Sequence, residues 1–322
     1  MTIIKDYELK EALSSKNAGF CRWGFCEKDG REYFIKEFLS PVYPEDSADL
    51  SPKTVERKQK LCEEFYASKY EFYSAVNSCR TGNIVTIREF FRYGPKYYAV
   101  TEKMESGKIT LEDISKRSDE VKITLIRAIL FSISALHKAG VIHADIKPDN
   151  ILLKRTVGDF YTAKIIDFDS GFLLGKTPQE VQGDFVYLAP ETYLKVRDGE
   201  GELTGKIDIF ALGVLFHQYW TGELPEINSD YRYVFEAVLD GSEPKLAGSI
   251  PLGIREMISR MLSADPEKRP EAEDILEFFR KTDPADSSLS EGHAADEANT
   301  DHRVYDDQTN NEEGFFIPRN LG

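Results

Sequence analysis

The chain has 322 residues, which is enough for one large two-lobed unit or two ordinary domains. A hydrophobic content of 41% and an aromatic content of 12% exclude a chain that is disordered throughout. The net charge of −15 argues against a general nucleic-acid or membrane-surface binder, because phosphate groups would repel such a surface.

The cysteines and the apolar runs predict a cytoplasmic protein. The four cysteines form no C-x-x-C pair, and no histidine lies near them at the spacing of zinc ligands. We therefore expect reduced thiols rather than disulfides or a metal site. The first residues carry charges where a secretory signal needs an apolar run. The longest apolar stretch, residues 207–220, is too short to span a bilayer.

The first hundred residues are expected to fold as strands around one helix. Strands are predicted for the aromatic-rich or apolar runs at 19–26, 31–38, 84–91 and 96–102. A proline-rich loop over residues 40–54 precedes a helix predicted over residues 55–76. The apolar residues that recur along this helix, and that we expect on its packing face, are Leu61, Phe65, Tyr66, Tyr70 and Tyr73.

From residue 119 onward the pattern is mostly helical. Helices are predicted at 120–138, 206–221, 231–239, 252–263 and 271–281, with a loop-rich stretch up to about residue 192. After residue 281 the chain is acidic and poor in apolar anchors, so we expect a disordered tail. The tail ends in the apolar run GFFIPRNLG at 314–322. That run is either a frayed, sticky end or a docking motif for a groove on a partner or on this chain itself.

The strongest chemical signal is HADIKPDN at residues 143–150, followed by DFD at 167–169. Phosphoryl transfer needs an acceptor for the hydroxyl proton, oxygen ligands for Mg²⁺ and a cation beside the reacting phosphate. The first motif offers Asp145, Lys147 and Asn150 within six residues. Asp167 follows two isoleucines that mark the end of a short buried strand. Convergence of Asp145, Asn150 and Asp167 would form a hard-oxygen metal site.

This arrangement resembles the H-R-D-x-K-P-x-N and D-F-G motifs of the eukaryotic-like (Hanks-type) Ser/Thr protein kinase family. The resemblance implies an α+β, bilobal fold. Its small β-rich N-lobe with one main helix would be residues 1–104, its larger and mostly helical C-lobe residues 105–281, and its acidic tail residues 282–322.

The resemblance also implies the roles of the motif residues. Asp145 would be the base that positions the substrate hydroxyl, and Lys147 the cation beside the phosphate. Asn150 and Asp167 would hold Mg²⁺, with Mn²⁺ as an alternative metal. Protein substrates would be the partners. A lysine at position 147 is typical of the Ser/Thr branch of the family.

The nucleotide site is implied in the same way. Lys36 would hold the α- and β-phosphates of ATP, although a lysine that ends an aromatic strand is by itself more often a surface residue. Its partner would be Glu71, with Glu63 and Glu64 as alternatives. The remaining ATP contacts would be Gly19 and Phe20 in the phosphate loop, Thr101 at the back of the adenine pocket, Glu102 to Met104 in the hinge between the lobes, and Leu152 as the floor.

Further landmarks appear in the family's order. The segment LAPE at 188–191 and the segment DPEKRP at 265–270 predict an ion pair between Glu191 and Arg269. Asp208, near the start of an apolar helix, matches the aspartate that ties this helix to the catalytic loop. Each signal is weak alone, because acids near helix starts are common caps.

The sequence also departs from the family pattern. The phosphate loop, KNAGFCRW at 16–23, keeps one displaced glycine, Gly19. Trp23 and Phe34 stand where small residues usually cover the adenine. Three interpretations stay open: a tight pocket, rings that stack on the base, or core packing through a shifted register. Ala144 replaces the arginine before Asp145, and Asp169 replaces the glycine of D-F-G.

These observations predict a protein kinase that transfers the γ-phosphoryl group of MgATP to a protein hydroxyl. Because Ala144 removes the cation that awaits an activation-loop phosphate, we expect activity without phosphorylation of that loop. The alternatives are a pseudokinase that acts as a binding module and, less favoured, a small-molecule phosphotransferase. Asp208 and residues 189–191 argue against the last, because in the family they build the platform for a peptide.

Overall fold

The computed structural model describes most of the chain. The described residues are 2–16, 19, 21–45, 50–105, 109–155, 161–178, 183–199, 201–282 and 315–316.

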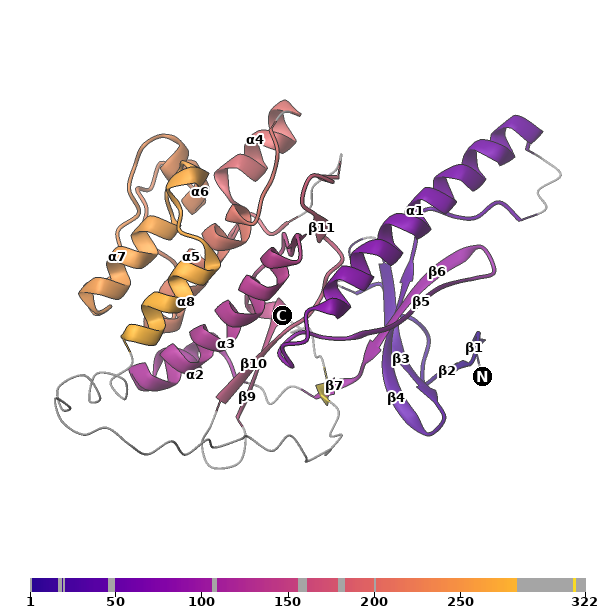
Figure 1. Ribbon diagram of the computed structural model, residues 1–322, viewed down its shortest axis with the longest axis horizontal. Coiled ribbons are helices and arrows are strands. Elements are labelled where there is room, and N and C mark those ends of the chain that lie inside the picture. The colour runs from indigo at the N-terminus through magenta and orange to yellow at the C-terminus, as the bar shows by residue number, and fades with distance from the viewer. Residues whose placement is uncertain are drawn as a thin grey trace, which may run out of the picture.

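Figure 1 shows a β-rich part that contains the N-terminus and a larger helical part beside it. Within the described residues, six strands form one antiparallel sheet in the order β1-β2-β3-β4-β6-β5. Their bounds are β1 Ile3–Ile4, β2 Tyr7–Leu9, β3 Cys21–Lys28, β4 Arg31–Phe38, β5 Ile87–Tyr93 and β6 Lys96–Glu102.

The hairpin between β3 and β4 sets the register that places the site residues. Asp29 and Gly30 have φ values of 53° and 75°, which suits a two-residue turn with two left-handed positions. The register pairs Trp23 with Lys36 and Phe25 with Phe34. Because side chains alternate along a strand, these four residues share one face of the sheet.

One long helix, α1 (Pro52–Ser78), packs beside this sheet, as Figure 1 shows. The side chain of Ser51 accepts a hydrogen bond from the backbone N–H of Thr54, and a proline follows at the first helical position. Both features are typical of a helix start. The buried residues of α1 are Cys62, Phe72, Tyr73 and Val76. Leu61 and Tyr70, which we expected on the packing face, are instead 56% and 58% exposed.

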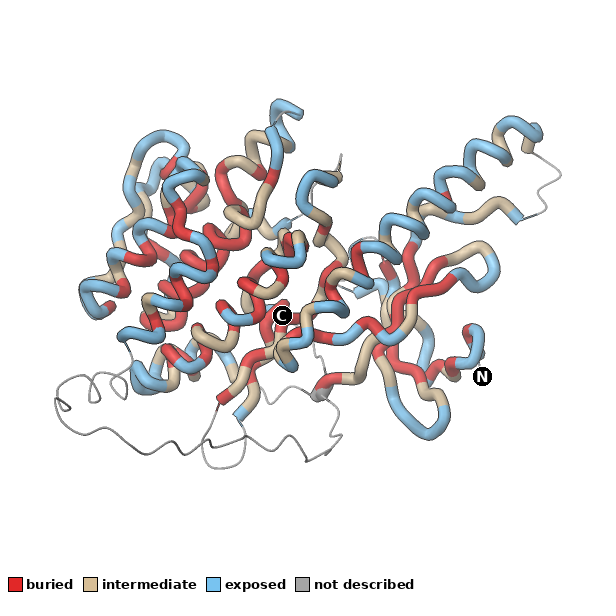
Figure 2. The backbone as a smooth tube through the Cα atoms, viewed as in Figure 1, coloured by how far each residue is buried: buried red, intermediate tan, exposed pale blue. Residues whose placement is uncertain are grey.

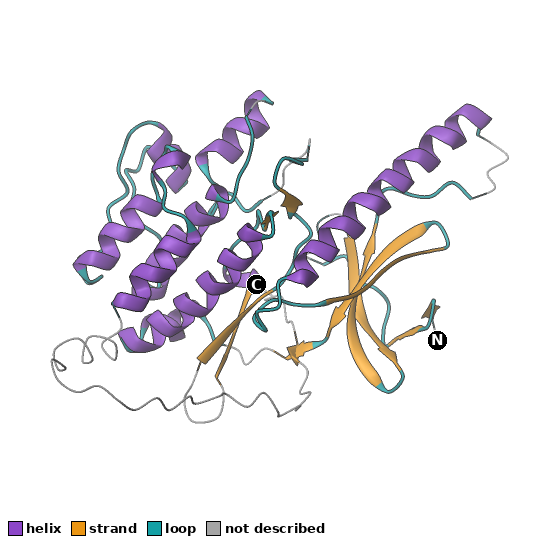
Figure 3. Cartoon of the chain, in the orientation of Figure 1, coloured by secondary structure: helices purple, strands orange, loops and turns teal. Residues whose placement is uncertain are grey.

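The rest of the described chain is mainly helical, as the colours of Figure 3 show. The remaining strands and short 3₁₀ turns are β7 Met104–Glu105, β8 Val141–Ile142, η1 Pro148–Asn150, β9 Ile151–Arg155, β10 Tyr161–Ile165, β11 Phe172–Leu173, η2 Pro266–Lys268 and β12 Phe315–Phe316. The helices are α2 Leu111–Ser115, α3 Asp119–Lys138, α4 Pro190–Asp198, α5 Lys206–Thr221, α6 Val234–Leu239, α7 Leu252–Met261 and α8 Ala272–Lys281.

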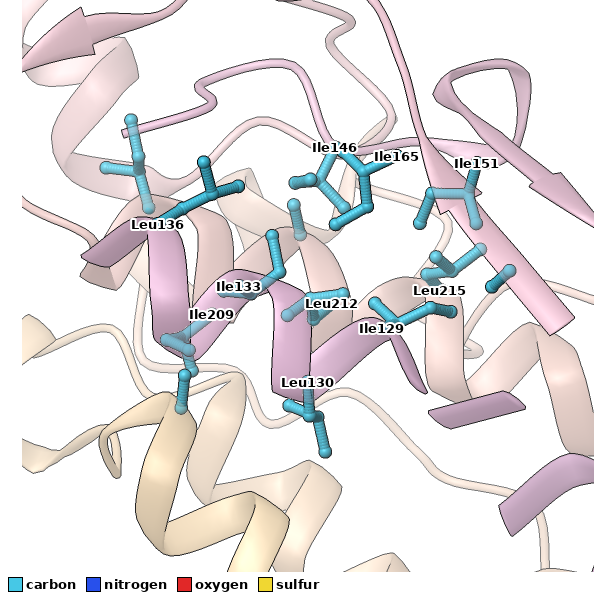
Figure 4. Close-up of a cluster of buried hydrophobic side chains, with 14 of the residues drawn as sticks. Ile129, Leu130, Ile133, Leu136, Ile146, Ile151, Ile165, Ile209, Leu212 and Leu215 are labelled. Carbon is cyan, nitrogen blue, oxygen red and sulfur yellow. The ribbon is translucent and has the colours of Figure 1, made fainter. Parts of the chain in front are cut away.

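The main core lies where α3 and α5 meet the strands that flank residues 143–150, the expected catalytic loop (Figure 2). Figure 4 shows side chains of α3 and α5 converging with Ile146, Ile151 and Ile165. All three isoleucines are at most 3% exposed. The catalytic loop is therefore fixed to the core at both ends, through Ile146 and through the β9–β10 pair.

The structure agrees with the expected α+β kinase fold and adds short elements that the sequence patterns did not predict. The helix predicted over 206–221 has those bounds, whereas α2, α4 and the pair β1–β2 were not predicted. These elements are too short or too irregular for a clear period. Phe315–Phe316 pairs in parallel with Met104–Glu105, so two residues of the predicted terminal motif lie beside the segment expected to be the hinge.

All four cysteines are free thiols. In the part of the chain that the structure describes, none of the helices has the length and apolar character that a membrane crossing requires.

Candidate active site

The catalytic loop brings Asp145, Lys147 and Asn150 into direct contact. The ammonium group of Lys147 lies 2.9 Å from Oδ2 of Asp145. The side-chain amide of Asn150 donates to the backbone oxygen of Asp145 at 2.7 Å and to its Oδ2 at 2.8 Å. Two donors therefore orient the Asp145 carboxylate, which is 15% exposed. Lys147 also donates to Oδ1 of Asp145 at 3.1 Å, so both oxygens of this carboxylate have a donor.

Asp208 anchors the start of this loop from the first turn of α5. Its carboxylate accepts hydrogen bonds from the backbone N–H groups of His143 at 2.9 Å and Ala144 at 2.8 Å, and from Nε2 of His137 at 2.9 Å. Burial alone would raise the pKa of Asp208, but the contacts with His137 and His143 outweigh it and hold the pKa below its usual value. The predicted link from this helix to the catalytic loop is confirmed.

His143 joins the catalytic loop to the segment that carries Asp167. Its ring is fully buried, accepts a hydrogen bond from the N–H of Asp145 at 3.3 Å and donates to the backbone oxygen of Ile166 at 3.0 Å. Phe168 packs on the same ring, with centroids 4.8 Å apart. Asp167 itself has a φ of 64°, a strained conformation that is common at functional sites.

Lys36 on β4 extends into this cluster. Its ammonium group lies 2.6 Å from Oδ1 of Asp167 and 2.7 Å from Oδ2 of Asp169. Burial by itself disfavours the charged lysine, but the two carboxylates outweigh it and raise the pKa of Lys36 above its usual value. The lysine is therefore held as a cation beside Asp167.

The expected pair between Lys36 and Glu71 is not formed. Both oxygens of Glu71 accept from Lys176 at 2.6 Å, and the side chains of this pair are each 55% exposed. Glu63 and Glu64 are also exposed. The three glutamates point away from the site because they lie off the buried face of α1.

The residue of α1 that does reach the site is Lys69, which the motifs did not single out. Its ammonium group donates to the backbone oxygen of Asp169 at 2.9 Å. It also lies 5.5 Å from the ring of Phe72 and 5.7 Å from that of Tyr73. Lys69 is seven residues after Cys62 and seven before Val76, both buried, so the period of the buried face could have identified it.

A cavity of about 50 Å³ lies between the sheet and the catalytic loop. Among the predicted site residues its wall includes Lys36, Thr101, Asn150 and Asp167. Glu102, Met104 and Leu152 are not among the described residues of this wall. The Glu102 carboxylate instead faces Arg88 and Lys164, at 3.3 and 3.5 Å, and Met104 is fully buried.

An aromatic cluster on β3 and β4 reaches this cavity through the ring of Phe34. Trp23 and Phe34 stack with centroids 5.7 Å apart, and Phe34 lines the cavity. Phe25 packs against both rings. Ligand sites commonly measure about 300–1,000 Å³. The ring of Phe34 therefore occupies part of the space that a nucleotide base would need.

The phosphate loop is only partly described. Gly19 has a φ of 56°, a conformation that glycine adopts without strain. Phe20 lies outside the described residues.

The segment from Asp167 to Glu191, the expected activation segment, is held at its end by the predicted ion pair. Arg269 is almost completely buried, and its two terminal nitrogens contact the two oxygens of Glu191 at 2.7 and 2.8 Å. Arg269 also donates to the backbone oxygens of Ser263 and Lys206. The prediction of a Glu191–Arg269 pair is confirmed.

Asn150 and Asp167 have the donor types that a hard divalent cation requires. The amide nitrogen of Asn150 is engaged by Asp145, so its amide oxygen is the atom that would face a metal. Both residues line the same cavity. Within the described region, no cluster of three or more His, Cys, Asp or Glu residues has metal-site geometry. A metal here would therefore complete its shell with phosphate and water oxygens, as Mg²⁺ commonly does.

A β-rich N-terminal part, a helical C-terminal part and a catalytic loop at their junction define the protein kinase fold. The family model for the protein kinase domain matches residues 45–278. The chain belongs to this family. Lys36 lies before the matched range.

The chain is similar to several curated protein kinases. It is 32% identical over 213 residues to the serine/threonine-protein kinase cds1 of Schizosaccharomyces pombe, covering 63% of this chain and 45% of the relative. It is 29% identical over 200 residues to sperm motility kinase Z of Mus musculus, covering 60% of this chain and 38% of the relative. A probable myosin light chain kinase of Dictyostelium discoideum is 28% identical over 207 residues, which cover 61% of this chain and 64% of that relative.

Proposed function

We propose that this chain is an active Ser/Thr-type protein kinase that transfers the γ-phosphoryl group of MgATP to a protein hydroxyl. The observation that carries the proposal is the convergence of Lys36, Asn150 and Asp167 on one cavity wall, with Asp145 in contact with Asn150. Names of the relatives support the Ser/Thr class. Residues 1–104 would form the N-lobe and residues 105–281 the C-lobe.

The residues of the loop would divide the work of phosphoryl transfer. Asp145, oriented by Lys147 and Asn150, would accept the proton of the substrate hydroxyl. Lys147, two residues away, would stay beside the transferred group as a cation. Asn150 and Asp167 would hold the metal, and Lys36 the α- and β-phosphates. When bound, Mg²⁺ neutralises negative charge on the phosphates.

We also propose that the site is assembled without phosphorylation of the activation segment. Where the H-R-D motif has an arginine, Ala144 offers only its backbone N–H, which bonds to Asp208. No cation at that position requires a phosphate for neutralisation. The buried Glu191–Arg269 pair fixes the end of the segment independently.

A second candidate function, a pseudokinase that acts as a binding module, is favoured by one observation. The cavity of about 50 Å³ beneath Trp23 and Phe34 is several-fold smaller than an ordinary ligand site of about 300–1,000 Å³. The two functions differ in whether the stacked rings move to admit ATP.

The deciding experiment is transfer of radiolabelled phosphate from ATP to a generic protein acceptor by phosphatase-treated protein. We expect the wild type to incorporate phosphate into the acceptor. Asp145→Asn and Lys36→Met should each lower the rate of incorporation at least a hundredfold, because each removes a charge that is proposed to act on the reacting groups. Equal incorporation in all three proteins would indicate a contaminating kinase. It would favour the binding module, as would a melting temperature that MgATP does not change.

A further inference from the structure

The helix beside the site presents a cation where a carboxylate is expected. Lys69 extends from α1 between the rings of Phe72 and Tyr73 and ends on the backbone oxygen of Asp169, at 2.9 Å. Burial lowers the pKa of Lys69, and the carboxylate of Asp169 opposes that shift. Glu71, two residues further on, lies on the exposed face with Lys176.

The segment after Asp167 is clamped against the same helix. A Cβ atom on Gly171 would lie 2.4 Å from the ring of Phe72 and 3.0 Å from the backbone oxygen of Ile142, so only glycine fits there. The bond from Lys69 and the close approach at Gly171 together fix the backbone of residues 169–171. The carboxylate of Asp169 is thereby held at 2.7 Å from Lys36.

The positive and negative charges in this cluster are equal in number. Two ammonium groups, Lys36 and Lys69, are matched by two carboxylates, Asp167 and Asp169. Among the described residues, these are the two carboxylates in contact with Lys36. If Asp167 turns to a metal ion, Asp169 is the one that stays with Lys36. A half-buried ammonium group without such a partner is costly.

We propose that Asp169 is the positioning residue for Lys36, and that Lys69 anchors Asp169 in place of a glutamate on the helix. This inference rests on the proposed function, because it deepens the role of Lys36 toward the phosphates. Asp169 lines the same cavity as Lys36, and in this scheme its effect on the nucleotide passes through Lys36. It acts by keeping the ammonium group of Lys36 directed toward the cavity.

The first test needs no nucleotide. Urea midpoints are measured for Lys36→Met, Asp169→Asn and the double variant, beside the same cycle with Glu71→Gln. We expect the midpoint shifts of Lys36→Met and Asp169→Asn to be clearly non-additive, and those of Lys36→Met and Glu71→Gln to add. Additive shifts at Asp169, or coupling at Glu71, would overturn the proposal.

The second test separates positioning from a structural role. We expect Asp169→Asn to raise the KM for ATP at least tenfold at the same acceptor concentration, and Glu71→Gln to change it less than twofold. Asp169→Gly combined with Lys69→Glu returns a carboxylate to the helix and should recover much of the affinity that Asp169→Gly loses. Failure of this rescue, or a tenfold effect of Glu71→Gln, would contradict the proposal. Coupling in urea without any turnover would support positioning and overturn the kinase activity instead.

Discussion

The ring of Phe34 lies in the cavity wall, two residues before Lys36 on the same strand face. It touches both Trp23 and Phe25, with centroids 5.7 and 5.8 Å away. Phe25 and Phe34 are both buried in this aromatic cluster, and the ring of Phe34 at the same time occupies space that a base would need. Packing and nucleotide access are opposed at this residue.

We predict that Phe34→Ala increases the affinity for MgATP several-fold while it lowers stability by about 3 kcal/mol, the lower end for such a truncation. Calorimetric titration with MgATP and urea unfolding measure the two effects. Phe25→Ala is the matched control, because Phe25 packs in the same cluster but is not among the described residues of the cavity wall. It should lose comparable stability with unchanged affinity. Weaker ATP binding by Phe34→Ala would show instead that the ring stacks on the base.

Among the residues of the site, the sequence predicts best the contacts between residues that are close together along the chain. Asp145, Lys147 and Asn150 lie within six residues, so one loop conformation brings them into contact. Lys69 lies about a hundred residues before its partner Asp169, and no local motif joins the two. In the sequence, only the helical period of α1 indicates that Lys69 faces the site.

The period of helix α1 separates the residue that reaches the site from the glutamates that do not. Leu61 and Tyr70 lie nine residues apart, or about 180° around the helix, so they fall on opposite edges of the buried face and do not mark its centre. The observed face contains Cys62, Lys69 and Val76 at seven-residue spacing. Glu71 then falls on the solvent side. Tyrosines are poor markers of phase, because they pack on a surface as readily as in a core.

Helix α5 connects the helical core to the catalytic loop through Asp208. The buried carboxylate accepts from two consecutive backbone N–H groups, and an asparagine there would turn its own N–H₂ toward one of these donors. We predict that Asp208→Asn lowers the free energy of unfolding by about 1–3 kcal/mol. Urea unfolding at neutral pH measures this difference.

The same variant should change the pH dependence of stability. The pKa of Asp208 is lowered in the folded protein, so its contribution is fully present above about pH 4, the value in the unfolded chain. It is lost as the pH falls through the lower folded value. The stability gap between wild type and Asp208→Asn should therefore narrow below about pH 4. A gap that stays constant from pH 6 to pH 3 would contradict this account. Asp240→Asn, on an exposed carboxylate, is the control.

At the scale of the whole molecule, the pattern of elements predicts the fold well because α3 has apolar residues at helical spacing and α5 is a long segment that is apolar on all sides. The arrangement of the parts depends on contacts between residues far apart in sequence. The buried pair Glu191–Arg269 is one such contact, and shared motif order predicted it. The pairing of Phe315–Phe316 with Met104–Glu105 is another, and its register could not be predicted.

We predict that deletion of residues 283–322 leaves the free energy of unfolding of the remaining chain unchanged. Its KM for ATP should stay within twofold of that of the full chain. A two-residue pairing with β7 offers about two backbone hydrogen bonds, worth about 1 kcal/mol each. Closing a connection of about 30 residues costs about 3 kcal/mol if it is unstructured, as its acidic composition predicts. The entropic cost of closing the connection exceeds the free energy gained from the two hydrogen bonds. The pairing of Phe315–Phe316 with β7 should therefore not restrict nucleotide entry. Urea unfolding and ATP kinetics of the full and shortened chains test this. A KM that falls tenfold on deletion would mean that the tail does restrict nucleotide entry.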